Sequence, residues 1–191
     1  MKINRIDWKS WQPEVSATLL FVIENDKILL IHKKRGLGAG KVNGPGGHIE
    51  KGETPMACAI RETREELCIE PGNVSYRGEL YFHAEDMPSI HAYVYTATSY
   101  QGKPAETAEA IPLWTPISEI PYQQMWQDDE IWLPEVLRGN SVKGWFSFES
   151  ENLLDHHLEI NPVVPDDTGM DYCASAFPAS TFQQDTWLRE C

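Results

Sequence analysis

The amino-acid sequence predicts an α/β sandwich built on a mixed β-sheet. Short runs rich in apolar and β-branched residues recur along the chain and indicate strands. A capped, periodic segment at 54–67 follows the second of these runs and indicates a helix. A second helical pattern at 128–137 precedes two further strand patterns. Strands and helices mixed in this way are typical of a layered α/β domain.

The first two strands are predicted to form a hairpin. Residues 16–24 and 27–31 are apolar runs, and the intervening pair Asn25-Asp26 is typical of a tight two-residue turn. Further strands are predicted at 74–83, 90–98, 111–114, 142–148 and 153–160, and the helix at 128–137 is predicted despite its internal proline.

The chain of 191 residues is long enough for one domain with an extension. The predicted strands and helices assign residues 1–160 to that domain. After Asn161 the composition changes to proline, serine, threonine and scattered aromatic residues without periodicity. We therefore assign 161–191 to a C-terminal extension that either wraps the domain or is partly mobile.

Composition excludes several classes of function. With 16 Lys and Arg against 29 Asp and Glu, the formal net charge is −13, which opposes binding to a nucleic-acid polymer. No apolar run is long enough to span a membrane, and the N-terminus lacks the pattern of a signal peptide. The four cysteines fit no zinc-binding spacing, so we expect reduced thiols and a cytoplasmic location. The sequence favours no oligomeric state.

A helix is predicted from Pro55 to about Leu67. Thr54 is a preferred N-cap residue, and Pro55 follows it at the first helical position. At 100° per residue, one apolar stripe of this helix comprises Met56, Ile60, Thr63 and Leu67. We expect this stripe to pack against the sheet.

Carboxylates gather on the opposite face of the same helix. Glu62, Glu65 and Glu66 lie at helical spacings, and Glu53, just before the helix, can fold back toward them. Carboxylates so close together repel one another, and a hard divalent cation such as Mg²⁺ or Mn²⁺ removes that repulsion. The alternative interpretation is a solvated acidic face partly balanced by the two arginines of the helix.

The carboxylate helix resembles the Nudix box, G-x5-E-x7-R-E-U-x-E-E-x-G-U. The matching residues are Gly47, Glu53, Arg61, Glu62, Glu65, Glu66 and Ile69. Two positions depart from the pattern, since Thr63 replaces an aliphatic residue and Cys68 replaces the second glycine. Cys68 puts in question the left-handed helix end that glycine would allow. The resemblance implies a Nudix α/β/α sandwich with a central mixed sheet.

The resemblance also implies a metal-dependent hydrolase of a nucleoside diphosphate linked to another group. Its metal ligands would be Gly46 through its carbonyl, Glu62, Glu65, Glu66 and Glu109, holding Mg²⁺ or Mn²⁺. The catalytic residues would be Glu53, Arg61, Glu65 and Glu66. Glu53 would pair with Arg61 and fix the loop against the helix, and Glu65 or Glu66 would take a proton from the attacking water. The metal neutralises the phosphate charge that otherwise repels water.

Segments beside the box, at 29–47 and 125–132, resemble the MutT-type branch that hydrolyses oxidised purine nucleoside triphosphates. This resemblance assigns substrate binding to Lys33, Leu37, Asn43, Trp126, Asp128 and Asp129. The asparagine and the two aspartates would recognise the edge of the oxidised base, and the tryptophan would stack on its face. The implied role is sanitation of the nucleotide pool, which avoids DNA damage.

The paired aspartates suit this task. Two adjacent carboxyl groups in a pocket do not easily both ionise, so one can donate a hydrogen bond while the other accepts one. Such a pair can distinguish 8-oxoguanine, whose N7 carries a proton, from guanine. From the residues alone, Asp128 and Asp129 could instead cap a helix, Trp126 could lie in the core, and Asn43 could serve a turn.

We expect 8-oxo-dGTP and related nucleotides to be converted to monophosphate and pyrophosphate. Lys33, Lys34, Arg35 and Lys41 of the glycine-rich loop are candidates to attract the triphosphate. Five departures from the branch, Leu37, Val42, Pro45, His48 and Ala110, suggest an altered pocket. They leave open hydrolysis of another nucleoside diphosphate-linked substrate. A non-catalytic, nucleotide-binding regulator is a third hypothesis, against which the intact box argues.

Overall fold

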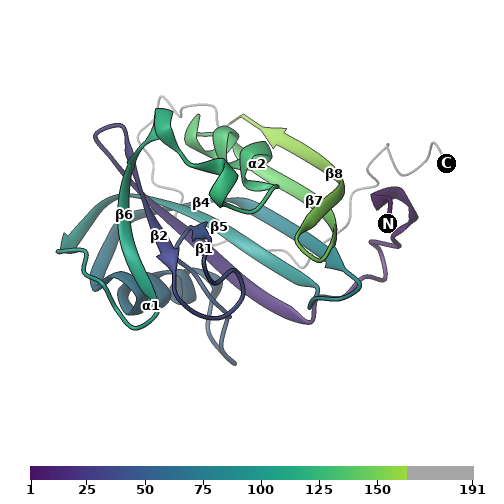
Figure 1. Cartoon of the computed structure of the whole chain (residues 1–191), viewed down its shortest axis with the longest axis horizontal. Coiled ribbons are helices and arrows are strands. Elements are labelled where there is room, and N and C mark those ends of the chain that lie inside the picture. The colour runs from purple at the N-terminus through teal and green to yellow at the C-terminus, as the bar shows by residue number, and fades with distance from the viewer. Residues whose placement is uncertain (163–191) are drawn as a thin grey trace.

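The computed structural model describes residues 1–162, which form a central sheet with helices on both of its faces (Figure 1). The strands are β1 (Val15–Glu24), β2 (Lys27–Lys33), β3 (Val42–Asn43), β4 (Ile69–Ala84), β5 (Ile90–Gly102), β6 (Ala110–Pro116), β7 (Ser141–Glu149) and β8 (Asn152–Asn161). The helices are α1 (Pro55–Leu67), α2 (Asp129–Leu137) and the short 3-10 turns η1 (Ile3–Arg5), η2 (Ile117–Glu119) and η3 (Tyr122–Gln124). The predicted extension lies outside the described residues from position 163 onward.

The sheet is mixed, as predicted. Its eight strands follow the order β3-β2-β1-β5-β4-β7-β8, and β6 pairs with β2. β1 pairs with β5 and β4 with β7 in parallel, whereas the other paired strands are antiparallel. In the β1–β2 turn, Asn25 and Asp26 have φ angles of 49° and 58°. Both values belong to the left-handed region that a two-residue hairpin turn of type I′ requires.

Alternate residues of the strands face two apolar cores. On β1, Leu20 packs with Leu67 of α1, whereas the next residue, Phe21, packs with Trp132 of α2. The rings of Phe21 and Trp132 have centroids 5.9 Å apart. Because successive strand residues point to opposite faces, α1 and α2 lie on opposite sides of the sheet. The structure therefore confirms the α/β/α sandwich (Figure 1).

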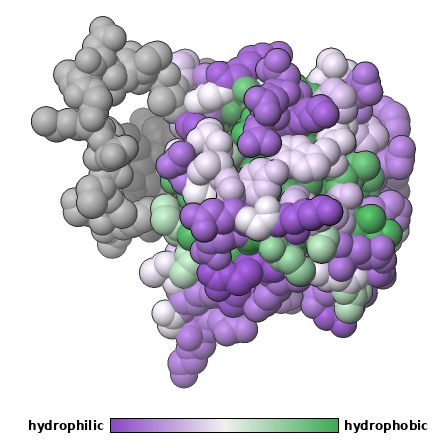
Figure 2. Space-filling model, turned by 90° about the vertical axis from the view of Figure 1, so that its left-hand side faces the viewer, coloured by the Kyte–Doolittle hydropathy of each residue, from purple (hydrophilic) through white to green (hydrophobic). Residues whose placement is uncertain are grey.

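The N-terminal residues form a third apolar cluster. Ile3 and Trp8 pack against Trp145 of β7, and the Ile3 amide donates a 3.1 Å hydrogen bond to Asp155 of β8. On the molecular face in Figure 2, hydrophilic residues predominate and apolar residues form small separate patches. Among the described residues, none of the helices has the length and apolar composition needed to cross a bilayer.

Several strand boundaries differ from the predicted ones. β4 begins at Ile69 rather than 74, because its first residues pair with the end of β5, as Pro71 does with Tyr100. Proline, glycine and asparagine in this stretch favour a turn locally, and pairing within the sheet overrides that preference. The short strand β3 was not predicted, because only two residues of the glycine-rich loop pair with β2.

Candidate active site

Helix α1 has the boundaries predicted from its sequence. Thr54 Oγ1 accepts a 3.3 Å hydrogen bond from the Ala57 amide, and Pro55 is the first helical residue. At the other end, Cys68 has a φ of 59°, and its amide donates to the carbonyl of Arg64. Cys68 therefore preserves the left-handed helix end, at a cost of about 1 kcal/mol relative to glycine.

The buried face of α1 differs from the predicted apolar stripe. Met56 was predicted to be buried and is 38% exposed, whereas Glu66, predicted on the opposite face, is 1% exposed. The buried residues of the helix are Cys58, Ala59, Thr63, Glu66 and Leu67. A carboxylate can be buried here because donors from another segment of the chain satisfy it, which helical periodicity alone does not reveal.

One of those donors comes from the loop before α1, which pairs with β1 in the manner of a strand. The amides of Thr18 and Leu20 donate 2.9 Å hydrogen bonds to the carbonyls of Gly47 and Pro45, respectively. Pro45 and Gly47 thus turn their carbonyls toward β1. In an extended chain, the intervening Gly46 therefore turns its amide and carbonyl away from β1.

Gly46 contacts the helix through this outward-facing amide. Its N–H donates a 2.9 Å hydrogen bond to Glu66 Oε2, and Lys33 Nζ lies 3.4 Å from Glu66 Oε1. Burial raises the pKa of the Glu66 carboxyl group, and the two donors partly oppose that effect. The buried carboxylate is thus held between the loop and Lys33 of β2.

The two glycines of this loop are fixed by close contacts. A Cβ atom at Gly46 would lie 1.9 Å from the Thr18 carbonyl oxygen, so no side chain fits there. A Cβ atom at Gly47 would lie 2.4 Å from the carboxyl carbon of Glu62. The first glycine of the Nudix box therefore leaves the space that the Glu62 carboxylate occupies.

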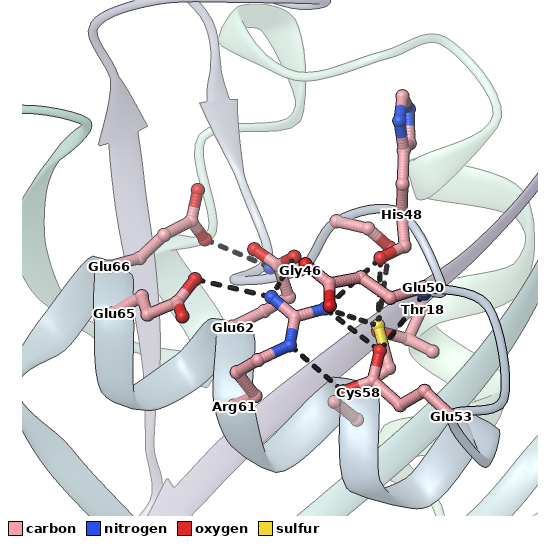
Figure 3. Close-up of polar contacts among 12 residues, drawn as sticks. Thr18, Gly46, His48, Glu50, Glu53, Cys58, Arg61, Glu62, Glu65 and Glu66 are labelled. Carbon is pink, nitrogen blue, oxygen red and sulfur yellow. Dashed lines mark hydrogen bonds and ion pairs between the residues drawn. The ribbon is translucent and has the colours of Figure 1, made fainter.

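Arg61 joins the loop to the helix (Figure 3). Its Nε and Nη2 atoms donate to the two carboxylate oxygens of Glu53 at 2.8 and 2.9 Å, a bidentate pair. Nη2 also donates to the His48 carbonyl at 3.1 Å. Hydrogen bonding to Arg61 lowers the pKa of Glu53 to about 2. The predicted pairing of Glu53 with Arg61 is thus present in the structure.

The same guanidinium separates two of the other carboxylates. Arg61 Nη1 lies 2.7 Å from Glu62 Oε1 and 3.2 Å from Glu65 Oε2 (Figure 3). Glu65 is half-exposed, whereas Glu62 is largely buried. Arg61 therefore offsets the repulsion between carboxylates that we expected a metal ion to relieve.

The donor set suits a hard divalent cation. Carboxylate and carbonyl oxygens are the ligands that Mg²⁺ and Mn²⁺ prefer, and Glu62, Glu65, Glu66 and Gly46 supply them on one side of α1. Within residues 1–162, no three acidic, histidine or cysteine side chains already converge on a single point. The residues fit a metal ion chemically, and Arg61 contacts only one carboxylate oxygen of Glu62 and one of Glu65.

The cations of the glycine-rich loop are distributed differently from the prediction. Lys33 lines the cleft described below, but Lys34 pairs with Glu106 at 2.8 Å and Arg35 pairs with Glu109. Lys34 and Arg35 thus have acidic partners after β5, and their attraction of a triphosphate stays a prediction. Glu109, a predicted metal ligand, contacts Arg35 in the structure, and its metal role stays a prediction.

One cleft lies on the α2 side of the sheet and reaches the loop before α1. It is lined by backbone and side-chain atoms of Ala17, Thr18, Leu19, Lys33, Leu37, Asn43, Gly44, Gly46, Gly47, His48, Phe82, His83, Ala84, Met87, Pro88, Ile90, Ala92, Trp126, Asp128, Asp129 and Phe148. All six residues predicted to bind substrate are among them. The cleft thus extends from the two aspartates to the glycines beside Glu66 and Glu62.

The two aspartates are buried side by side in this cleft. Asp128 and Asp129 are 3% and 7% exposed. Burial raises the pKa of Asp128 to about 6. Burial and the neighbouring Asp128 charge raise the pKa of Asp129 well above its usual value. Both pKa shifts are in the direction expected for adjacent buried carboxyl groups, which favours retention of a proton by the pair.

The aspartate side chains do not act as a simple helix cap. Asp128 occupies the N-cap position of α2 without a capping hydrogen bond from its side chain, and instead accepts a 2.8 Å bond from Trp132 Nε1. Asp129 Oδ2 accepts a 3.1 Å bond from the Trp126 amide. These bonds hold both carboxyl groups in place at the cleft wall.

Asn43 and Trp126 are brought together by Gly38. The Asn43 side-chain amide donates a 3.4 Å hydrogen bond to the Gly38 carbonyl. At Gly38, where φ is 78°, a Cβ atom would lie 3.0 Å from Asn43 Nδ2 and 3.1 Å from Trp126 Nε1. The turn conformation that the sequence analysis considered for Asn43 is found at Gly38 instead. The absence of a side chain there lets the loop approach both Asn43 and Trp126.

Some cleft residues were not predicted, and some predicted departures lie elsewhere. Phe82 and Phe148 line the cleft, and the alternation of their strands could have placed them on one sheet face. Val42, Pro45 and Ala110 are buried and are absent from the cleft lining. Val42 and Ala110 pack in the two cores, so any influence of these residues on the pocket would be indirect.

Comparison with known proteins agrees with this geometry. The NUDIX domain family matches residues 13–136. The chain is 36% identical to the oxidized purine nucleoside triphosphate hydrolase of Danio rerio over 73% of this chain and 90% of that protein. It is 33% identical to the protein of the same name from Mus musculus, over 72% of this chain and 88% of that protein.

Solved structures show the same fold. The MutT protein from Bacillus halodurans aligns with a TM-score of 0.69 and 24% identity, over 76% of this chain and 97% of that chain. The MutT NUDIX hydrolase from Burkholderia pseudomallei aligns with a TM-score of 0.58 and 26% identity, over 65% and 98%. With the box residues assembled around α1, these matches show that the chain is an enzyme of the Nudix hydrolase family.

Proposed function

We propose that this Nudix hydrolase converts oxidised purine (deoxy)nucleoside triphosphates, such as 8-oxo-dGTP, to the monophosphate and pyrophosphate. The carrying observation is that one cleft contains both the buried aspartate pair and Lys33, whose ammonium group contacts Glu66 of the box. A base held at Asp128 and Asp129 would extend its phosphates toward Lys33 and the loop glycines. The names of the relatives from zebrafish and mouse support the same substrate class.

Base recognition would rest on the shared proton. With one aspartate protonated and one ionised, the pair donates one hydrogen bond and accepts another, which complements the oxidised edge of 8-oxoguanine. Plain guanine presents an acceptor at N7 and would leave the ionised carboxylate without a donor. Leaving a buried polar group unpaired costs about 1–3 kcal/mol, which corresponds to roughly a fivefold to 150-fold preference.

Hydrolysis would take place at the carboxylate face of α1. Gly46, Glu62, Glu65 and Glu66 would hold Mg²⁺ or Mn²⁺, with Glu109 as a further ligand. When bound, the metal would neutralise phosphate charge and promote the attack of water. Arg61 would hold Glu53 and the loop against α1. Glu65 or Glu66 would accept the proton of the attacking water.

The experiment is a pyrophosphate-release panel with Mg²⁺. It compares kcat/KM for 8-oxo-dGTP, dGTP, 2-oxo-dATP, O6-methyl-dGTP and ADP-ribose. We expect a preference of about a hundredfold, or ~2.7 kcal/mol, for an oxidised purine. Asn43→Ala and Asp128→Asn should raise KM for the oxidised purine more than for dGTP, and Asp26→Asn in the exposed turn is the matched control. A flat panel, or equal effects of both variants on both nucleotides, would remove the substrate assignment.

A further inference from the structure

Lys41, which we expected near the triphosphate, lies instead on the tryptophan of the cleft. Its ammonium group is 5.0 Å from the centroid of the Trp126 ring, within the range of a cation–π interaction. The same group lies 3.0 Å from Glu151 Oε2, in the turn between β7 and β8. Glu151 thus anchors the cation over the indole.

Lys41 covers one face of the Trp126 indole. Trp126 lines the cleft, whereas Lys41 is absent from its lining. Phe148 meets the indole edge-on, at 6.2 Å and 89°, and Gly38 lies against its Nε1 edge. Trp126 is therefore held by a cation over one face and by neighbours at its edges.

Lys33 and Lys41 have different places in this arrangement. Lys33 lines the cleft and contacts Glu66, so its charge faces the expected path of the phosphates. Lys41 would have to leave both Trp126 and Glu151 to reach that path. Its charge is partly neutralised by Glu151, which further weakens any attraction for a triphosphate.

We propose that Lys41 is a positioning residue for base recognition that acts through Trp126. Its cation fixes the ring plane and draws electron density from the indole, which favours stacking of an electron-rich purine on the opposite face. An 8-oxo purine is more electron-rich than the plain purine, so the arrangement would add to the selectivity of the aspartate pair. This inference rests on the proposed function, since it concerns the same cleft.

The test measures binding of 8-oxo-dGMP and dGMP in the presence of EDTA, so that neither metal binding nor catalysis contributes. Lys41→Met should weaken binding of 8-oxo-dGMP about threefold to tenfold, the size expected for a cation–π contact, and weaken dGMP less. Lys41→Arg should restore most of the affinity. Lys27→Met, on the exposed end of β2, is the matched control and should bind as the wild type does.

The same substitution in a Trp126→Leu protein distinguishes a lysine that acts through the indole from a lysine that attracts the phosphates. If Lys41 acts through the indole, Lys41→Met should have no further effect in Trp126→Leu. An equal effect in both backgrounds, or weaker competition by inorganic triphosphate, would assign Lys41 to the phosphates and overturn the inference while leaving the proposed function intact. If the wild-type protein binds 8-oxo-dGMP and dGMP equally, base selectivity fails, and the inference fails with it.

Discussion

The indole nitrogen of Trp132 donates a 2.8 Å hydrogen bond to Oδ2 of Asp128, one helical turn earlier on α2. Trp132 is fully buried beside Phe21, so a core residue directly sets the chemistry of the cleft wall. The bond stabilises the ionised carboxylate and partly opposes the rise in its pKa that burial causes.

Trp132→Phe should therefore raise the pKa of Asp128 further. Binding of the oxidised base needs one protonated carboxyl group and weakens as pH rises through the titration of the pair. The variant should retain its affinity to a higher pH than the wild type, as measured by 8-oxo-dGMP binding between about pH 5 and 9. Trp114→Phe, on the α1 side of the sheet, controls for the loss of ring volume. A pH dependence identical to that of the wild type would show that Trp132 does not affect the titration of the aspartate pair.

The aspartate pair should destabilise the folded protein at neutral pH. Because the pKa values in the folded state lie above the unfolded ones, the pair contributes most stability below about pH 4, and this contribution is lost as pH rises through about 6 and beyond. A shift of the Asp128 pKa from 3.8 to about 6 corresponds to a loss of roughly 3 kcal/mol.

Asp129→Asn should accordingly raise the melting temperature more at pH 8 than at pH 5, while base selectivity falls. Thermal unfolding at both pH values measures the difference, with Asp26→Asn as the exposed control. An asparagine variant that is equally destabilised at both pH values would contradict a shared buried proton.

The two loop glycines should tolerate alanine very differently. At Gly46 the added Cβ meets the Thr18 backbone at 1.9 Å, so Gly46→Ala should prevent the loop from pairing with β1 and lower stability by several kcal/mol. At Gly47 it meets only the movable end of Glu62, so Gly47→Ala should fold and bind Mn²⁺ more weakly. Circular dichroism measures the loss of stability in Gly46→Ala, and electron paramagnetic resonance of Mn²⁺ measures the weaker metal binding in Gly47→Ala. Equal Mn²⁺ affinity in Gly47→Ala and wild type would argue against Glu62 as a ligand.

Loss of either proposed catalytic glutamate should reduce hydrolysis without unfolding the protein. In Glu66→Gln, the side-chain amide oxygen can still accept from the Gly46 amide, so the loop stays docked. We expect Glu65→Gln and Glu66→Gln to lower kcat by at least about a hundredfold with Mg²⁺. Glu24→Gln, exposed at the hairpin, is the matched control. Near-wild-type rates in both variants would refute the assignment of the metal site.

Arg61→Lys tests whether geometry or charge matters at the loop. Lysine keeps the charge but cannot form the bidentate pair with Glu53 or reach Glu62 at the same time. We expect a fall in kcat of roughly tenfold or more, with the Kd for 8-oxo-dGMP unchanged. A matching rise in that Kd would indicate that the loop supports the base cleft as well.

Local signals in the sequence predicted helix α1 well, because Thr54 and Pro55 fix its start by short-range chemistry. The burial of Glu66 could not be predicted in this way. It depends on the amide of Gly46, whose orientation follows from pairing of its loop with β1. Similarly, Cys68 keeps the helix end because its contacts in the fold outweigh the strain of its φ angle.

The candidate base cleft was predictable through resemblance, whereas the positions of the cations around it were not. Asp128, Asp129 and Trp126 meet as the resemblance implied. The cations of the glycine-rich loop scatter because their acidic partners, among them Glu106 and Glu151, come from distant parts of the chain. Spacing along a loop gives no information about such partners, which only the folded sheet brings into reach.

The loop before α1 is hydrogen-bonded to β1, so the candidate active site and the sheet are expected to unfold together. The Thr18 and Leu20 amides are bonded to Gly47 and Pro45, and the Ile49 amide donates to Ser16 at 2.9 Å. Hydrogen exchange at these three amides should therefore be slow, and it should report whether the loop is docked without any substrate or metal. A variant whose sheet is intact but whose loop has opened would be recognised by fast exchange at Thr18, Leu20 and Ile49 alone.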